Sequence, residues 1–196
     1  MPIGLWAVRL DRPLTEEETA ELMSLLPAER RERLLRIGAE KRQEPLCAYG
    51  VLRLALRRTY GWQTLPQMAR TERGKPYFLE LPNVHFSLSH TEGAVLAGIS
   101  DRPLGVDIER IRPVSHLLLD SMEKGREDFF SVWVRREARS KRTGIGMGAM
   151  LREEPPMEEG EGYIALEIFP GYAAGVSAQA TDLPGTLRVC SLEELI

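Results

Sequence analysis

The stretch LGVDIE at positions 104–109 places apolar residues at one parity and Gly, Asp and Glu at the other. This alternation predicts a strand with two different faces. Asp107 and Glu109 then point the same way, with Cα atoms roughly 7 Å apart. Two carboxylates so placed could hold a hard cation such as Mg2+, which prefers oxygen ligands. The alternative is the solvated face of an ordinary half-exposed strand, which alternates in the same way.

Two more strands are expected just upstream of this stretch. Residues 84–88 alternate between apolar and polar, and residues 94–99 form a short apolar run. Together with residues 104–108 they predict a small sheet with tight turns.

Polar groups that suit phosphate gather at the end of the first of these strands. Ser89, His90 and Thr91 follow its apolar residues, and Lys75 and Pro76 lie in a turn shortly before it. Hydroxyls, backbone N–H groups, a lysine and a histidine are typical partners of phosphate oxygens. A nucleophilic relay from Ser89 to His90 is not expected, because adjacent residues on a strand point to opposite faces.

A helix is expected downstream over residues 129–141. Helical geometry puts Trp133, Glu137 and Lys141 on one face at successive steps of four residues. Glu137 could add a third carboxylate to the strand pair, and Lys141 could reach a phosphate. The alternative is an exposed ion pair between Glu137 and Lys141.

The remaining elements determine the fold class. Helices are expected from Thr15, where Glu18 completes a capping box, over the basic stretch 30–36, and from Pro45 to Gly61. Further strands are expected at 3–10, 163–169, 172–180 and 186–190. Runs of helix followed by runs of strand predict an α+β protein.

The similar order of elements in the two halves permits two related subdomains. We place the boundary between residues 1–104 and residues 105–196. The stretch 152–162, which holds five Glu and two Pro, is expected to be an exposed loop.

The charge balance argues against a globally basic nucleic-acid binder, because 26 Lys and Arg face 29 Asp and Glu, for a net charge of -3. Local basic regions remain: residues 28–58 carry a surplus of +5 and residues 135–142 a surplus of +4, and both are expected to contact phosphate. No apolar run is long enough to cross a bilayer and no secretion signal is recognisable, so a cytoplasmic protein is expected. Cys47 and Cys190 belong to no Cys-x-x-Cys pair and are expected to be reduced.

Four ordered motifs together resemble the 4'-phosphopantetheinyl transferase superfamily, in particular its surfactin-synthetase-activating type. They are Gly-Lys-Pro at 74–76, FSLSH at 86–90, GVDIE at 105–109, and Trp133-x-x-Arg-Glu-Ala-x-x-Lys141. The resemblance implies a pseudo-twofold α+β fold of two similar subdomains with the active site between them. It also implies transfer of phosphopantetheine from coenzyme A to a serine of an acyl or peptidyl carrier protein, with release of adenosine 3',5'-bisphosphate.

The resemblance also implies roles for individual residues. The carboxylates of Asp107, Glu109 and Glu137 would hold Mg2+ against the pyrophosphate of coenzyme A. Glu137 and Lys141 would be the catalytic residues, with Glu137 as the general base unless a metal-bound water takes that role.

The other implied contacts are with coenzyme A, and Lys141 would also pair with one of its phosphates. Ser89, His90 and Thr91 would bind phosphate oxygens, Lys75 and Pro76 would lie near the adenosine, and Arg30 and Arg33 would contact the 3'-phosphate. The expected partners are coenzyme A and a carrier protein, with no nucleic acid and no membrane, and the protein is expected to be a monomer.

Two alternatives stay open. Arg136 and Pro45 stand where the family usually has Lys and Arg, and the connection between Glu109 and Trp133 is short. A shortened relative that binds coenzyme A with weak or no transfer activity is therefore one alternative. A metal-dependent phosphohydrolase, which would use the same carboxylates without a carrier, is the other.

Overall fold

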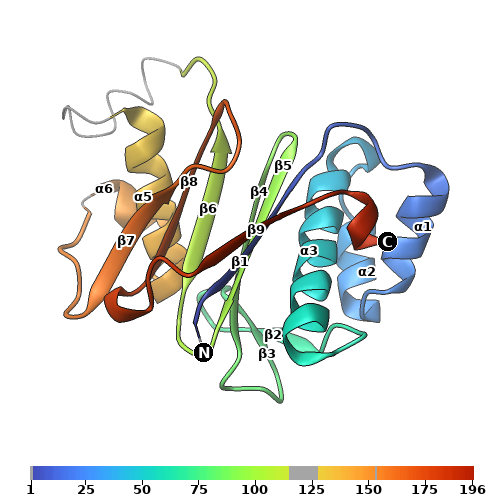
Figure 1. Ribbon diagram of the computed structural model, residues 1–196, viewed down its shortest axis with the longest axis horizontal. Helices are drawn as coiled ribbons and strands as arrows, with labels where there is room; N and C mark the ends of the chain where they lie inside the picture. Colours follow the sequence, from blue (N-terminus) through green and yellow to red (C-terminus); the bar gives the residue numbers. More distant parts are fainter. Residues whose placement is uncertain (1, 115–127, 153) are drawn as a thin grey trace.

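The computed structural model describes residues 2–114, 128–152 and 154–196. Its elements form successive layers: three helices, a four-stranded sheet, a three-stranded sheet and a further long helix (Figure 1). This arrangement confirms the α+β class.

The helices are α1 (Glu16–Ser24), α2 (Ala28–Leu35), α3 (Gln43–Tyr60), α5 (Phe129–Thr143) and α6 (Met147–Arg152), with 3-10 turns at Ala39–Lys41, Ala180–Asp182 and Glu193–Leu195. The strands are β1 (Gly4–Arg9), β2 (Met68–Arg70), β3 (Pro76–Phe78), β4 (His85–Thr91), β5 (Ala94–Ser100), β6 (Gly105–Arg110), β7 (Glu161–Leu166), β8 (Tyr172–Gln179) and β9 (Thr186–Cys190).

The first sheet combines strands from both ends of the sequence. Its order is β4-β5-β1-β9, with β5 antiparallel to both neighbours and β9 parallel to β1. The second sheet has the order β6-β8-β7 and is antiparallel throughout. β2 and β3 form a separate hairpin.

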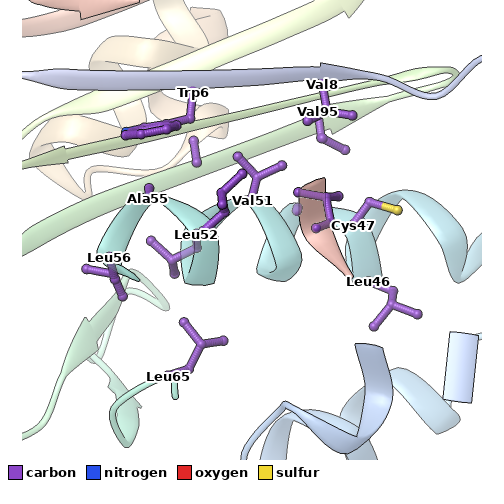
Figure 2. Close-up of a cluster of buried hydrophobic side chains, with 14 of the residues drawn as sticks. Trp6, Val8, Leu46, Cys47, Val51, Leu52, Ala55, Leu56, Leu65 and Val95 are labelled. Atoms are coloured by element: carbon purple, nitrogen blue, oxygen red, sulfur yellow. The ribbon is translucent and has the colours of Figure 1, made fainter. Parts of the chain in front are cut away.

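The first sheet is buried on both faces, which explains why residues 94–99 are apolar without alternation. Trp6, Val8 and Val95 point toward α3, where Figure 2 shows them above Val51, Leu52 and Ala55. Leu5, Ala7 and Leu96 belong to a second core between the two sheets. Every strand residue from Ala94 to Ser100 is therefore buried.

The two faces of β6 also differ, as its alternation predicts. Val106 and Ile108 pack into the second core with Val176 of β8. The opposite parity faces α5, and a Cβ on Gly105 would lie 1.9 Å from the carbonyl oxygen of Ala138. Glycine at this position thus lets α5 lie directly against β6, beside Asp107 and Glu109.

The expected ends of the helices are largely confirmed. Thr15 and Glu18 form both hydrogen bonds of a capping box at the start of α1. α3 ends at Gly61, whose φ of 75° is left-handed and favours glycine. Cys47 and Cys190 are free and buried, as expected.

The stretch 152–162 differs from the expected exposed loop. Glu161 is buried, and it is the first residue of β7, which runs to Leu166 rather than over 163–169. Most of the short connection between Glu109 and Trp133 lies outside the described residues.

Candidate functional site

A cavity of about 600 Å3 lies between the helical layer and α5. Side chains from α2, α3, the turn around β2 and β3, β4 and α5 line it. Six of the lining residues carry a positive charge: Arg33, Lys41, Arg70, Arg73, Lys75 and Lys141. Glu137 is the acidic residue among those that line it in the described ranges. A cavity with this charge balance attracts anionic ligands.

Three predicted carboxylates gather at the side of this cavity where β6 meets α5. Burial raises the pKa of Glu137, the carboxylates of Asp107 and Glu109 raise it further, and the Lys141 ammonium opposes them. Glu137 itself lines the cavity. Grouped carboxylates repel one another, and a cation between them removes that cost.

Asp107 is 2% exposed, and its two oxygens are in different situations. Oδ1 accepts hydrogen bonds from Ser89 Oγ and Lys141 Nζ, each at 2.7 Å. Oδ2 is buried and has no hydrogen-bond partner within residues 2–114, 128–152 and 154–196. A buried oxygen of this kind calls for a ligand, and a hard cation coordinated by oxygen atoms fits it.

The carboxylates are not drawn together into a finished metal centre. Among the residues that the structure describes, no three His, Cys, Asp or Glu side chains form a group that could hold a metal ion as they stand. Lys141 Nζ lies against Asp107 and is 3.8 Å from Glu137 Oε1, so its ammonium neutralises part of the cluster.

Five of the predicted coenzyme A contacts line the cavity: Arg33, Lys75, Pro76, His90 and Lys141. Burial and the nearby Arg142 lower the pKa of Lys75 to about 8, and its Nζ donates to the Arg142 carbonyl at 2.5 Å. Desolvation, with a contribution from Lys141, lowers the pKa of His90.

The other three predicted contacts lie elsewhere. Ser89 and Thr91 are buried behind the cavity wall, and their hydroxyls bond to Asp107 and Glu109. Arg30 is 1% exposed and does not line the cavity. In the described part of the chain its three guanidinium nitrogens have no hydrogen-bond partner, and the carboxylate of Glu29 lies 3.6 Å from one of them. Arg30 and Arg33 both lower the pKa of Arg70, after burial, so the three guanidinium groups lie near one another.

Sequence reasoning missed several cavity residues. Lys41 belongs to the basic region 28–58 but is not among the predicted coenzyme A contacts, and Arg70 and Arg73 both precede the Gly-Lys-Pro turn. Their charges immediately before that turn were the available signal. Arg70 is held there because it donates to the Gly74 carbonyl at 2.6 Å.

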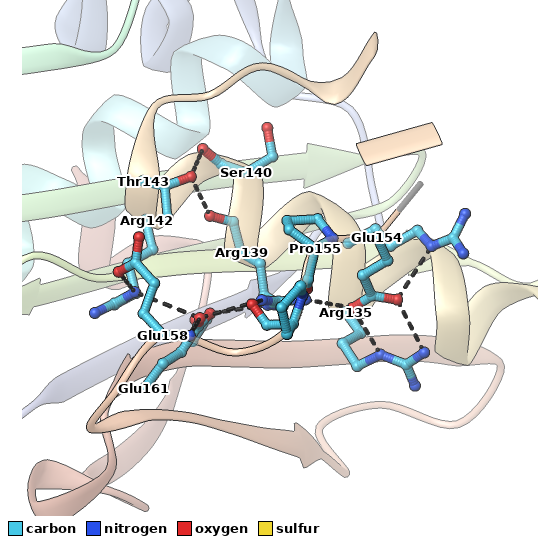
Figure 3. Close-up of polar contacts among 12 residues, drawn as sticks. Arg135, Arg139, Ser140, Arg142, Thr143, Glu154, Pro155, Glu158 and Glu161 are labelled. Atoms are coloured by element: carbon cyan, nitrogen blue, oxygen red, sulfur yellow. Dashed lines mark hydrogen bonds and ion pairs between the residues drawn. The ribbon is translucent and has the colours of Figure 1, made fainter. Parts of the chain in front are cut away.

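The expectation that the whole basic stretch 135–142 contacts phosphate is wrong for the side of α5 opposite the cavity, where arginines pair with carboxylates. Figure 3 shows the acidic stretch 154–161 folded over this side of the helix. Glu154 accepts hydrogen bonds from Arg135, Arg136 and Arg139. Burial alone would raise the pKa of Glu154, but the bonds from Arg135 and Arg139 outweigh it and lower that pKa to about 2.

A smaller cavity of about 230 Å3 lies at the start of α5. It is lined by Glu109, Arg112, Phe129, Phe130 and Trp133, among others. Phe129 and Trp133 stack with ring centroids 5.8 Å apart. Glu109 thus lines this aromatic cavity and also lies near Glu137.

Comparison with known proteins finds full-length relatives. Two proteins of Bacillus subtilis, the 4'-phosphopantetheinyl transferases ffp and Sfp, are 27% and 26% identical over 98% of this chain and 99% of their own length. The 4'-phosphopantetheinyl transferase HetI of Nostoc is 28% identical over 86% of this chain and 83% of its own. No protein-family model matches the chain. In the described residues no helix is both long and apolar enough to span a bilayer.

Proposed function

This chain belongs to the Sfp-type 4'-phosphopantetheinyl transferases, and we propose that it catalyses phosphopantetheine transfer with the help of Mg2+. It would transfer phosphopantetheine from coenzyme A to a serine of an acyl or peptidyl carrier protein and release adenosine 3',5'-bisphosphate. The observation that carries the proposal is a cavity with six cationic side chains that is also lined by Glu137, which lies near the carboxylates of Asp107 and Glu109. The cationic side chains suit an anionic nucleotide, and the carboxylates suit a bound cation.

The cationic part suits the nucleotide end of coenzyme A. Arg33 faces the cavity and Arg30 lies close behind it, and both would serve the 3'-phosphate. Lys75 and Pro76 would lie near the adenosine, and His90 would donate to a phosphate oxygen. A guanidinium with unfilled donors is suited to a phosphate because it can offer two parallel N–H bonds.

The carboxylate part suits the pyrophosphate and its metal. Asp107, Glu109 and Glu137 would hold Mg2+, and the unpartnered Oδ2 of Asp107 is the observation that favours a cation there. Mg2+ bound there would neutralise the bridging phosphates and help the bisphosphate to leave. Lys141 would exchange its contact with Asp107 for a contact with a phosphate oxygen.

Glu137 is the proposed general base, and a difference in pKa limits how it can act. An ordinary glutamate of pKa about 4.3 faces an alcohol about as weakly acidic as water, at about 15.7, a difference of about 15 kcal/mol. Burial raises the pKa of Glu137 and narrows this difference without closing it. Proton transfer to Glu137 therefore accompanies attack on phosphorus, directly or through a water.

We also propose the pseudo-twofold arrangement of the family. In support, α3 packs on β1 and β5 of the first sheet, while α5 packs on β6 and β8 of the second. The division would fall between residues 104 and 105, with β9 crossing back to the first sheet. A monomer that acts in the cytoplasm remains our expectation.

The test is mass spectrometry of apo carrier proteins after incubation with coenzyme A and Mg2+. A mass gain of one phosphopantetheine per carrier is expected from the wild-type protein. Nucleotide binding without any mass gain supports the binding-module alternative, and release of phosphate or nucleotide without a carrier supports the phosphohydrolase.

The sharpest variant is Glu137→Gln, which is nearly isosteric but uncharged. We expect its transfer rate to fall by about 100-fold or more, while the metal-free affinity for adenosine 3',5'-bisphosphate is unchanged. Glu159→Gln, at an exposed position, is the matched control and should transfer at the wild-type rate. Wild-type transfer by Glu137→Gln would remove Glu137 from the mechanism.

A further inference from the structure

Three hydroxyls on β4 join the two sheets. Ser87, Ser89 and Thr91 alternate along the strand and are all buried. Their oxygens accept hydrogen bonds from the β6 backbone N–H groups of residues 106, 108 and 110, at 3.0, 3.3 and 3.3 Å. Side-chain hydroxyls thus take the place that backbone carbonyls hold in an ordinary sheet. We call this set the hydroxyl ladder.

Two members of the hydroxyl ladder also reach the carboxylates of β6. Ser89 Oγ donates to Asp107 Oδ1 at 2.7 Å, and Thr91 Oγ1 donates to Glu109 Oε2 at 3.2 Å. Ser87 has the same backbone contact with β6, and its hydroxyl bonds to no carboxylate of the residues that the structure describes. In the ladder, Ser89 and Thr91 each bind a carboxylate as well as a backbone N–H, whereas Ser87 binds only a backbone N–H.

The hydrogen-bonding capacity of Ser89 is filled. A serine hydroxyl has one donor and two acceptor sites. The donor goes to Asp107, and the oxygen accepts from the Ile108 N–H and from Lys141 Nζ, the latter at 3.0 Å. Ser89 therefore has no proton left for a phosphate, and it does not line the cavity.

The orientation of Asp107 follows from these contacts. Ser89 and Lys141 both bind Oδ1, and Oδ2 is the oxygen left without a partner among the described residues. Ser89 keeps Oδ1 fixed when Lys141 turns to a phosphate. A carboxylate attached through two rotatable bonds would otherwise lose freedom on binding a cation. Hydrogen bonds from neighbouring side chains to ligand carboxylates are a general means of orienting them toward a metal.

We infer that Ser89 and Thr91 are positioning residues, which hold Asp107 and Glu109 in place for the divalent cation, rather than direct ligands of a phosphate. This inference rests on the proposed function, since it takes these carboxylates as metal ligands. It replaces the phosphate-binding role that the family resemblance implies for both residues. Ser87 completes the ladder without a share in orienting the carboxylates.

The test compares metal binding with nucleotide binding in the full-length protein. Mn2+ binding is titrated by electron paramagnetic resonance in the presence of coenzyme A, and coenzyme A binding is measured separately by calorimetry in EDTA. Ser89→Ala and Thr91→Val should each weaken Mn2+ binding by about 10-fold or more, and leave coenzyme A binding in EDTA unchanged. Ser89→Thr and Thr91→Ser keep the hydroxyl and should restore Mn2+ binding.

Ser87→Ala is the matched control, because it removes a rung of the ladder but no carboxylate contact. Since Ser87 lines the cavity, its coenzyme A affinity in EDTA is measured as well, and Mn2+ is titrated at saturating coenzyme A. Its Mn2+ affinity should equal that of the wild type. An equal loss of Mn2+ binding in Ser87→Ala would show that the ladder acts only by holding the sheets together. Weakened coenzyme A binding in EDTA with unchanged Mn2+ affinity in Ser89→Ala would overturn the inference in favour of a direct phosphate contact.

Different results would refute the proposed function and the positioning role of Ser89 and Thr91. A wild-type protein that binds no Mn2+ with coenzyme A and modifies no carrier would refute the proposed function itself. A wild-type protein that does both, beside Ser89→Ala and Thr91→Val proteins with wild-type Mn2+ affinity, would refute only the positioning role. Should Ser89→Ala fail to fold, Ser89→Thr and Thr91→Val still separate the outcomes.

Discussion

The two basic regions of the sequence, residues 28–58 and 135–142, have a similar surplus of positive charge but different surroundings. In the second region, Arg139 donates to Glu161, to Glu154 and to the carbonyls of Pro155 and Pro156 (Figure 3). In the first region, Arg30 is as deeply buried, yet its guanidinium makes no hydrogen bond to the residues that the structure describes. Arg139 and Arg30 are thus alike in burial and differ in their supply of acceptors.

This difference separates structural charge from charge kept for a ligand. Glu161 also accepts from Ser177 and from the Glu158 N–H, so the charge of Arg139 is paired and each of its three guanidinium nitrogens donates to an oxygen. A buried charge without acceptors costs stability, and such a cost is typical of a functional site. The unfilled donors of Arg30, which lies near the cavity residue Arg70, thus indicate the side of the cavity where an anion binds.

The largest effect is expected from the filled cluster. Arg139→Met leaves Glu161 buried without its main partner, and the free energy of unfolding should fall by about 3–5 kcal/mol. Urea denaturation measures the loss. Arg110→Met, which breaks an exposed ion pair with Glu92, is the control and should cost at most about 1 kcal/mol. Similar losses in the two variants would contradict the structural role of the cluster.

The unfilled region should respond in the opposite direction. Arg30→Met removes a buried charge that lacks hydrogen bonds, so stability to urea should stay equal or rise. Affinity for adenosine 3',5'-bisphosphate should fall by about tenfold or more, because hydrogen bonds to charged groups are worth about 1.5–3 kcal/mol. Isothermal titration calorimetry measures it. Arg31→Met is the control on the same helix, where the side chain donates to the Ser24 carbonyl, and its affinity should be unchanged. A strong loss of stability in Arg30→Met would place Arg30 with the structural cluster.

A smaller effect should follow from pH. The free protein holds the pKa of Lys75 at about 8, below the value in an unfolded chain, because burial disfavours the ammonium. A bound phosphate favours the charged form, so binding above pH 8 requires proton uptake. Affinity for the bisphosphate should be level near pH 7, where its phosphates are largely doubly ionised, and fall by at most about tenfold per pH unit above 8. The Lys75→Arg protein stays charged, and its affinity should show no such fall. Equal slopes in both proteins would exclude Lys75 from the contact.

Local patterns predicted the elements well, because they depend on neighbouring residues. The capping box at Thr15, the end of α3 at Gly61 and the two faces of β6 were all readable in the sequence. The nearness of Glu137 to Asp107 and Glu109 followed from ordered motifs rather than from spacing, since they lie on separate elements.

The missed features are pairs between distant segments. Arg139 and Glu161 are 22 positions apart, and no periodicity links a helix to the strand that follows an irregular stretch. Arg70 and Arg73 reach the cavity from a turn whose position depends on the packing of the β2–β3 hairpin. Only interatomic distances show that the Ser89 hydroxyl donates to Asp107, because the same FSLSH pattern is compatible with a hydroxyl that faces either the cavity or β6.

The place of β9 beside β1 bears on how the protein is synthesised. β1 is made first, but its second edge stays unpaired until residues 186–190 exist. The same core also waits for Leu195, whose carbonyl accepts from Arg53 at 2.9 Å. An open strand edge can pair with other chains. The nascent chain therefore carries an aggregation-prone edge from the synthesis of β1 until β9 is made, and the core that contains β1 cannot be completed before then.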